Sequence, residues 1–227
     1  MVAAVILFGL HCGQSASERR SSIYELTAEP SEGNILKIRA MLDDADRDIR
    51  ATALNALFGL KVADADELAL DGLNDEDGFV RATAAKLLGD AGDRAYAPAL
   101  VACLSEDPDP VARQRAAEAL HVLGGPDAVE ALARGLEDPM EKVRRASIQG
   151  LRDLDPGYAR NTLLRLLRDD AVWEIRAQAA RTLGLIEGPE IVSALKAALD
   201  DPNEFVRSAA SNALRLRERT GTGGDAG

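Results

Sequence analysis

An arginine recurs along this 227-residue chain at intervals of 31, 32, 31, 32 and 31 residues, and an aspartate lies six residues before each occurrence. The six pairs are Asp44 and Arg50, Asp75 and Arg81, Asp107 and Arg113, Asp138 and Arg144, Asp170 and Arg176, and Asp201 and Arg207. A fixed period of this length is typical of repeat proteins, in which each unit packs only on its neighbours. The period therefore predicts an elongated array whose core is a continuous strip.

Each period contains two stretches of helical spacing that a short turn separates. In the second stretch, apolar or small residues return every three or four positions, as Val80, Ala84 and Leu88 do. One such stripe is typical of a helix that buries a single face. The pattern predicts six helix-turn-helix units, over residues 34–62, 63–93, 94–124, 125–154, 155–187 and 188–219.

Short polar residues, proline and glycine indicate where several helices begin and end. Asp109 followed by Pro110 favours a helix start, because aspartate accepts hydrogen bonds from free amides and proline lacks a donor that the first turn would leave unpaired. Gly124 favours a helix end. Asp64 and Glu67 have the spacing of a capping box, so we expect a helix to begin with that reciprocal cap.

The amino terminus allows two interpretations. Val2 to Leu10 is apolar but too short to span a bilayer as a helix. Cys12, followed by Gly13 and Gln14, resembles the lipidation site of bacterial lipoproteins, although the basic segment that opens an export signal is missing. Residues 1–12 are therefore either a leader whose Cys12 tethers a periplasmic protein to a membrane, or the apolar end of a cytoplasmic protein.

Two flanking segments lack the repeat. Residues 13–33 are polar and predict a linker, with one short helical turn where Ser22 and Glu25 have capping-box spacing. Residues 220–227 are rich in glycine and have no apolar periodicity, which predicts a disordered tail. The repeat domain is expected to cover residues 34–219.

The turn and second helix of each unit resemble the HEAT-like repeats of the phycobilisome-lyase type. The segments Asp107–Leu120 and Asp201–Ala210 carry the resemblance, which extends over about residues 34–217. It implies an all-α fold, a right-handed alpha-solenoid of about six helix-turn-helix repeats. It also implies that the aspartate in each turn and the arginine on each second helix bridge adjacent repeats. We therefore expect these twelve residues to fasten repeats together rather than to form a row of ligand sites.

Charge is distributed unevenly along the array. The formal net charge is −11, and an acidic surface repels phosphate backbones, so we expect no nucleic-acid partner. Residues 43–94 contain 13 acidic and 6 basic side chains, whereas residues 112–185 contain 11 acidic and 12 basic ones. The central second helices therefore offer either a groove for an acidic partner or an ordinary solvated surface. The candidate partner-binding arginines are Arg115, Arg145, Arg152 and Arg181.

Three aromatic residues, Phe79, Trp173 and Phe205, lie two or three positions before a repeated arginine. Aromatic side chains at the rim of a groove often anchor a partner protein. Side chains of this size also fill gaps between neighbouring turns. Both roles remain open from the sequence, so we include all three among the candidate partner-binding residues.

The sequence contains no recognisable catalytic constellation. His11 and His121 are its two histidines, and neither belongs to the repeated His-Glu pairs that hold iron in HEAT-like deoxyhypusine hydroxylases. Cys103 is expected to be a buried, inert thiol. We therefore expect no metal and no cofactor, and we predict a non-enzymatic scaffold that binds another protein. The alternative that the resemblance suggests is a bilin-lyase-like or other small-ligand enzyme factor.

Overall fold

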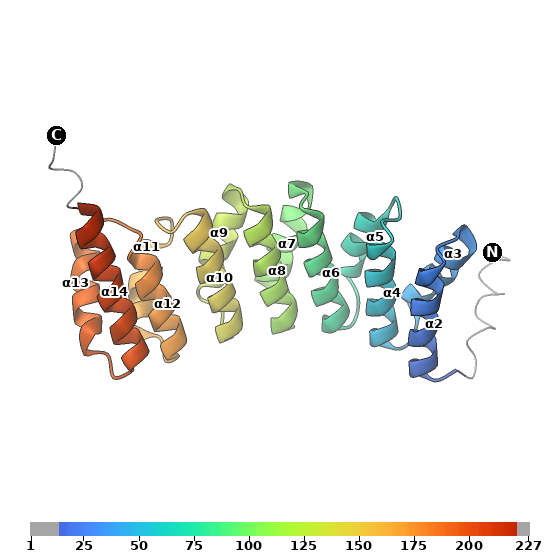
Figure 1. Ribbon diagram of the computed structural model, residues 1–227, viewed down its shortest axis with the longest axis horizontal. Coiled ribbons are helices and arrows are strands. Elements are labelled where there is room, and N and C mark those ends of the chain that lie inside the picture. The colour runs from blue at the N-terminus through green and yellow to red at the C-terminus, as the bar shows by residue number, and fades with distance from the viewer. Residues whose placement is uncertain (1–13, 222–227) are drawn as a thin grey trace.

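The computed structural model describes residues 14–221, with side chains up to residue 218. Within that range the chain forms 13 α-helices joined by short turns, and the described residues include no strand. The helices form two layers along an elongated molecule, with the second helix of every unit in one layer (Figure 1). The predicted all-α solenoid is therefore confirmed.

Six helix pairs follow a single helix at the amino-terminal end. That first helix is α2 (Ala16–Ala28). The first helices of the pairs are α3 (Glu32–Ala40), α5 (Ala65–Gly72), α7 (Ala97–Glu106), α9 (Pro126–Gly135), α11 (Arg160–Asp169) and α13 (Pro189–Ala197). The second helices are α4 (Arg47–Gly59), α6 (Gly78–Ala91), α8 (Pro110–Leu123), α10 (Glu141–Leu154), α12 (Trp173–Leu183) and α14 (Glu204–Gly221). Three 3-10 turns complete the array, at Met41–Asp43, Arg94–Tyr96 and Ala198–Asp200.

The prediction of a linker over residues 13–33 is wrong for most of that segment, because it contains α2 and the start of α3. A capping box begins α2: the Ser15 hydroxyl accepts from the Glu18 amide, and the Glu18 carboxylate accepts from the Ser15 amide at 2.7 Å. The helix packs on the first repeat through Ile23, which is completely buried. Ile23 and Leu26 are the two aliphatic residues larger than alanine in a helix that is otherwise mostly polar, so the periodic signal is weak and the sequence pattern missed this helix.

Both capping boxes predicted from spacing are also wrong. Ser22 lies inside α2, where its hydroxyl donates to the carbonyl oxygen of Glu18. Asp64 does occupy the N-cap position of α5, but its side chain makes no cap hydrogen bond. Its carboxylate instead accepts from the guanidinium of Arg39 on α3, one repeat earlier. The Asp64 carboxylate therefore pairs with a side chain of the preceding repeat and not with the amides at the start of its own helix.

The helix boundaries predicted in the third unit are confirmed. Asp109 caps α8 by accepting from the amide of Val111 at 2.7 Å, and Pro110 is the first residue of the helix. Gly124 ends α8 with φ of 64°, a conformation that a side chain would disfavour. These local rules worked because each cap is formed by residues adjacent in sequence.

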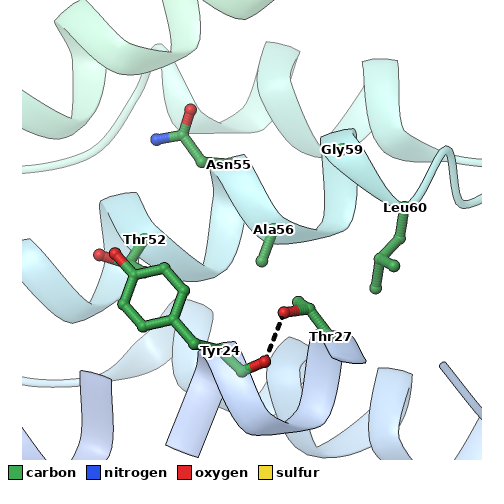
Figure 2. Close-up of a pocket in the computed structure, with 7 residues that line it drawn as sticks. All are labelled: Tyr24, Thr27, Thr52, Asn55, Ala56, Gly59 and Leu60. Atoms are coloured by element: carbon green, nitrogen blue, oxygen red, sulfur yellow. Dashed lines mark hydrogen bonds between the residues drawn. The ribbon is translucent and has the colours of Figure 1, made fainter. Parts of the chain in front are cut away.

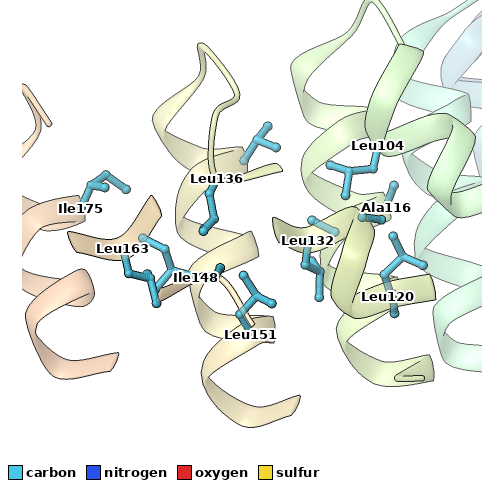
Figure 3. Close-up of a cluster of buried hydrophobic side chains, with 14 of the residues drawn as sticks. Leu104, Ala116, Leu120, Leu132, Leu136, Ile148, Leu151, Leu163 and Ile175 are labelled. Carbon is cyan, nitrogen blue, oxygen red and sulfur yellow. The ribbon is translucent and has the colours of Figure 1, made fainter. Parts of the chain in front are cut away.

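The core is a strip between the two layers. Leu132 and Ile148 are at most 1% exposed, and they lie beside Leu120 and Leu163 from neighbouring repeats (Figure 3). A smaller cluster around Ile23 fills the space under α2. Alanines at the middle of the second helices are buried too, which lets these helices approach closely.

The structure describes the carboxyl-terminal boundary of the repeat domain but not the predicted leader at the amino terminus. Helix α14 extends to Gly221, so the helix runs two residues past the predicted end of the repeat domain. The predicted leader and its Cys12, and the remainder of the predicted tail, lie outside the described residues. Within residues 14–221, no helix combines the length and hydrophobicity needed to cross a bilayer.

A candidate interaction face on the second helices

Each repeated arginine joins its own turn to the turn of the next repeat. Arg81 donates from Nε and Nη2 to the two carboxylate oxygens of Asp107, at 2.7 and 2.8 Å. Its third nitrogen, Nη1, donates to the carbonyl oxygens of Asp75 and Glu76 in its own repeat. The carboxylate of Asp107 also accepts from the amide of Asp109, two residues on. The arginine therefore pairs with the following repeat's aspartate, and both groups are satisfied.

The same bridge links every consecutive pair of repeats, and we call the set the Arg–Asp ladder. Its other members are Arg50 with Asp75 at 2.8 Å, Arg113 with Asp138 at 2.7 Å, Arg144 with Asp170 at 2.9 Å, and Arg176 with Asp201 at 2.8 Å. The arginine side chains of the ladder are only 9–13% exposed. A ligand in solution would find few of these groups accessible.

The two ends of the ladder differ. At the amino-terminal end of the described residues, Arg19 of α2 pairs with Asp44 at 2.8 Å and so takes the place of a ladder arginine. The sequence contains a signal for this role, because Arg19 precedes Arg50 by one period of 31 residues. At the other end, Arg207 is exposed and donates to the carbonyls of Asp201 and Pro202, and no carboxylate among the described residues pairs with it.

The ladder perturbs the ionisation of its carboxyl groups. Burial acts to raise the pKa of Asp107, but hydrogen bonds from Arg81 and from the Asp109 amide outweigh it and hold this pKa below its usual value. The pKa of Asp75 is lowered by the same balance, with Arg50 as the donor. For Asp201 the hydrogen bond from Arg176 is the largest influence and lowers the pKa against the effect of burial. These carboxylates are therefore charged at neutral pH.

Aromatic residues bridge neighbouring repeats above the ladder. The rings of Trp173 on α12 and Phe205 on α14 stack with their centroids 5.0 Å apart. At the equivalent positions of an earlier pair of repeats, the guanidinium of Arg47 lies 5.8 Å from the ring centroid of Phe79. Each contact joins the second helices of two adjacent repeats. Phe79 and Phe205 nevertheless keep about half of their surface exposed, so their role as partner anchors stays a prediction.

Two hollows lie side by side on the second-helix layer. The first, of about 340 Å³, lies between α8 and α10 and is lined by Gln114, Glu118, His121, Lys142, Arg145, Ala146 and Gln149. The second, of about 110 Å³, lies between α10 and α12 and is lined by Ile148, Gln149, Arg152, Gln178, Arg181 and Thr182. Because both include Gln149, they form one groove across three second helices, which we call the central groove.

The central groove contains arginines without partners. Arg145, Arg152 and Arg181 are exposed, and no carboxylate in the described part of the chain forms an ion pair with them. Arg115, the fourth arginine predicted for this face, differs because it pairs with Glu118 at 2.7 Å. Three arginines in one groove, together with Lys142, which is likewise unpaired among the described residues, therefore remain available to an anionic group, in a protein whose formal net charge is −11.

Two polar atoms beside these arginines also lack a hydrogen-bond partner. They are Oγ1 of Thr182, a residue with no exposed surface, and Oε1 of Gln178. Buried polar groups in folded proteins are nearly always hydrogen-bonded, so each such exception requires an explanation. The sequence did not single out Thr182, because a threonine inside a helix has no functional signature.

A further hollow, of about 500 Å³, lies near the amino-terminal end between α2 and α4. Tyr24 and Thr27 of α2 face Thr52, Asn55 and the small residues of α4 across it (Figure 2). Its lining is uncharged, and Thr27 donates its hydroxyl hydrogen bond to the carbonyl of Tyr24 in its own helix. This hollow therefore lacks the unpaired charges that distinguish the central groove.

The remaining residues considered for chemistry are engaged in packing or ion pairs. His121 on α8 contacts Asp153 on α10 at 3.0 Å. Cys103 is buried, and burial together with the nearby Asp107 carboxylate raises the pKa of its thiol to about 12, so it stays protonated. Among residues 14–218, no group of three or more metal-ligating side chains is assembled.

Comparison with known protein families identifies two matches. The family of HEAT repeats matches residues 35–121 and 129–215. The family described as PBS lyase HEAT-like repeat matches residues 112–138, which contain most of α8 and all of α9. No curated protein sequence matches the chain.

Several solved structures share the fold. YibA from Escherichia coli is 21% identical, with a TM-score of 0.65 over 91% of this chain and 80% of that one. An archaeal HEAT-like repeats protein from Thermococcus onnurineus NA1 is 16% identical, with a TM-score of 0.55 over 91% and 98%. The complex of CpcE and CpcF of phycocyanin lyase from Nostoc sp. PCC7120 contains a chain 22% identical, with a TM-score of 0.52 over 95% and 94%. At these identities the likeness concerns the fold alone.

Proposed function

The chain belongs to the HEAT-repeat family, and from this we propose that it is a scaffold that binds another protein along its second-helix layer. The Arg–Asp ladder uses its charged groups internally, so it leaves binding to the residues that vary between repeats. Repeat solenoids of this kind present extended surfaces to their partners. The family membership supports a scaffold, and the identity of the partner is a separate question.

The observation that carries this proposal is the set of unpaired arginines in the central groove. Most other arginines in the described chain, such as Arg160 with Glu190 and Arg165 with Glu137, have a carboxylate within 3 Å. Arg145 and its neighbours in the groove have none. Arginine is also enriched among the residues that dominate protein–protein binding energies.

The proposal is tested by recovering partners from the native cell with and without the groove charges. We expect Lys142→Glu/Arg145→Glu to lose proteins that the wild type captures after crosslinking. The control is Arg134→Glu, which lies on α9 in the other layer and forms only a loose pair with Glu130 at 3.6 Å. Identical partner sets for all three proteins, compared by quantitative mass spectrometry, would contradict the proposal.

A bilin-lyase-like or other small-ligand factor is the alternative to a scaffold. It is supported by the resemblance to a phycocyanin lyase chain, and at 22% identity that resemblance concerns the fold. No observation on the described residues favours a tetrapyrrole or a catalytic step over protein binding. An absorbance titration of the purified protein with a panel of tetrapyrroles would reveal such a ligand.

Membrane tethering through Cys12 also remains a proposal, because Cys12 lies outside the described residues. Mass spectrometry of the mature amino terminus tests it directly. A diacylated Cys12 at the first position would support the tether, and an intact segment 1–12 would contradict it. The result does not affect the binding face, which lies far along the chain.

A further inference from the structure

We infer that the central groove binds an extended, acidic segment of the partner protein, with one carboxylate held by Arg152 and Arg181 between α10 and α12. The inference rests on the proposed scaffold function and adds the chemistry and conformation of what is bound. It combines three independent features of the groove: unpaired positive charge, unpaired buried polar atoms, and length.

The charge selects a carboxylate. Arg152 and Arg181 come from neighbouring helices and line the same hollow, so one anionic group between them can accept from both. Arginine pairs with carboxylates through parallel N–H donors, which adds geometric specificity to the attraction. Nothing in the described chain already neutralises these two side chains. These two arginines are therefore free to bind an anionic group of another molecule.

The unpaired polar atoms indicate that the anion belongs to a peptide. The Thr182 hydroxyl can donate a hydrogen bond, and Oε1 of Gln178 can accept one. A peptide main chain offers a carbonyl acceptor and an N–H donor side by side, and so can satisfy both atoms at once. A fully deprotonated anion such as sulfate offers acceptors only. Both atoms are covered in the free protein, so binding requires side chains that line the hollow to move.

The dimensions of the groove set the spacing of the acidic residues. Packed helices lie about 8–10 Å apart, and an extended chain advances about 3.3–3.6 Å per residue, so one repeat corresponds to about three residues of peptide. A second carboxylate about three residues away from the first would reach Arg145 and Lys142 in the adjoining hollow. The expected ligand is a segment of about six to eight residues with acidic side chains at that spacing.

The protein's overall charge favours a peptide over a nucleic acid. A polyphosphate strand carries a negative charge on every nucleotide, and the net charge of −11 repels it along its whole length. A peptide with two carboxylates places its charge only where the groove is basic. The acidic side chain that lines the groove, Glu118, is already paired with Arg115.

The test is a selection of random octapeptides displayed on phage, carried out on the wild-type protein and on Arg152→Gln/Arg181→Gln. We expect the wild type to enrich peptides with two acidic residues about three positions apart, and the double variant to lose that enrichment. For a selected peptide, we expect Arg152→Gln and Arg181→Gln each to weaken binding about tenfold in fluorescence anisotropy. The control Arg134→Gln should bind like the wild type.

Thr182→Val separates recognition from folding. Because the Thr182 hydroxyl has no partner in the free protein, replacing it by a methyl group should leave the thermal midpoint unchanged or raise it. The same change should weaken binding of the selected peptide about tenfold, since it removes a hydrogen-bond donor to the peptide main chain. A variant that melts like the wild type but binds less tightly would support the site, whereas unchanged binding would overturn this part of it.

Three results would overturn the inference as a whole. They are enrichment of peptides without acidic residues, no enrichment at all, and a single-stranded DNA octamer that displaces the selected peptide at lower concentration than the unlabelled peptide does. None of these bears on partner capture from cells, so the scaffold proposal would stand. Conversely, a groove that selects acidic peptides while capture from cells fails would support the chemistry assigned to the groove and remove the scaffold proposal on which its partner depends.

Discussion

The ladder arginines have more than one task, because each holds its own turn in shape and also holds the next repeat. Arg113 donates to the carbonyl of Asp107 in its own turn and to the carboxylate of Asp138 in the next. Arg207 makes the same own-turn bonds without a following carboxylate. The two residues therefore allow the contribution of the bridge to be isolated.

We predict that Arg113→Ala lowers the free energy of unfolding by about 3 kcal/mol, because it leaves the poorly exposed Asp138 carboxylate unpaired. Arg207→Ala should cost no more than about 1 kcal/mol, as expected for an exposed residue. Urea unfolding followed by circular dichroism measures both. Equal losses would mean that the own-turn hydrogen bonds, and not the bridges, carry the stability. A double-mutant cycle that combines Arg113→Ala with Asp138→Asn checks that Arg113 acts through Asp138.

The lowered pKa of Asp107 predicts a pH dependence of known sign. A carboxyl group whose pKa is lower in the folded state stabilises the protein above its unfolded pKa, which is about 3.9, and this stabilisation is lost as the pH falls through the folded value. Asp107→Asn cannot gain or lose that charge. We therefore expect the stability difference between wild type and Asp107→Asn to be constant from pH 7 to about pH 5 and to shrink below about pH 4.

Urea unfolding of both proteins at pH 7, 5 and 3 measures this difference. Arg207→Ala serves as the matched control, because it leaves all five bridges of the Arg–Asp ladder in place. Arg207 contributes only the smallest of the effects that lower the pKa of Asp201, so the difference of this variant from the wild type should vary less over the same range. A wild-type advantage over Asp107→Asn that grows on acidification would contradict the direction assigned to the Asp107 pKa.

At the scale of helices, the repeats depend on close approach between second helices. A Cβ added to Gly89 on α6 would lie 2.8 Å from the Cβ of Ala119 on α8. The α6–α8 contact therefore has room for glycine opposite Ala119 but not for a larger side chain at position 89. By contrast, a Cβ added to Gly59 at the end of α4 would meet nothing within 4 Å.

The same substitution should therefore have opposite effects at these two glycines. Gly89→Ala should destabilise the protein by about 1–3 kcal/mol, because the helices must move apart. Gly59→Ala should stabilise it by up to about 1 kcal/mol, because alanine favours the helix. Thermal unfolding of the pair gives both signs in one experiment. Destabilisation by Gly59→Ala would show that this position is more constrained than its surroundings indicate.

Helix α2 acts as the amino-terminal cap of the array. It contributes the buried side chain of Ile23 and a bridge from Arg19 to Asp44. This bridge is equivalent to the one that each of the helices α4, α6, α8, α10 and α12 makes with the repeat that follows it. Without a cap, the apolar face of the first repeat would be open to water. Terminal units of repeat proteins commonly have this atypical composition.

At the scale of the molecule, contacts between nearest neighbours predict that a complete period can be removed. Deletion of residues 113–143 joins Ala112 to Arg144 and again places Asp107 six residues before an arginine. We expect the shortened protein to fold with unchanged helicity per residue and lower total stability. Deletion of residues 128–143, half a period, removes Asp138 and should give a partly unfolded protein. Circular dichroism and hydrogen exchange distinguish the two shortened proteins. Similar helicity and protection in both would contradict the nearest-neighbour description.

The helical repeats, their period and most of their boundaries were predictable from the amino-acid order. Each depends on residues that are close in sequence or separated by a constant interval: the caps at Asp109 and Gly124, the apolar stripes, and the recurrence of aspartate and arginine. A periodic pattern repeats its signal six times, so a single weak unit does not obscure it. The amino-acid order also favoured a scaffold, because the repeated aspartates and arginines carry the resemblance to HEAT-like repeats.

What required the folded structure were the choices between partners of similar chemistry. Asp64 has a local cap available and binds Arg39 instead, and α2 packs on the array although its sequence resembles a linker. Of four arginines expected to face a partner, Arg115 is paired and three are free, because that depends on which carboxylate each side chain can reach in space. The sequence lists the charged groups, and the packing of one repeat on the next leaves some of them unpaired.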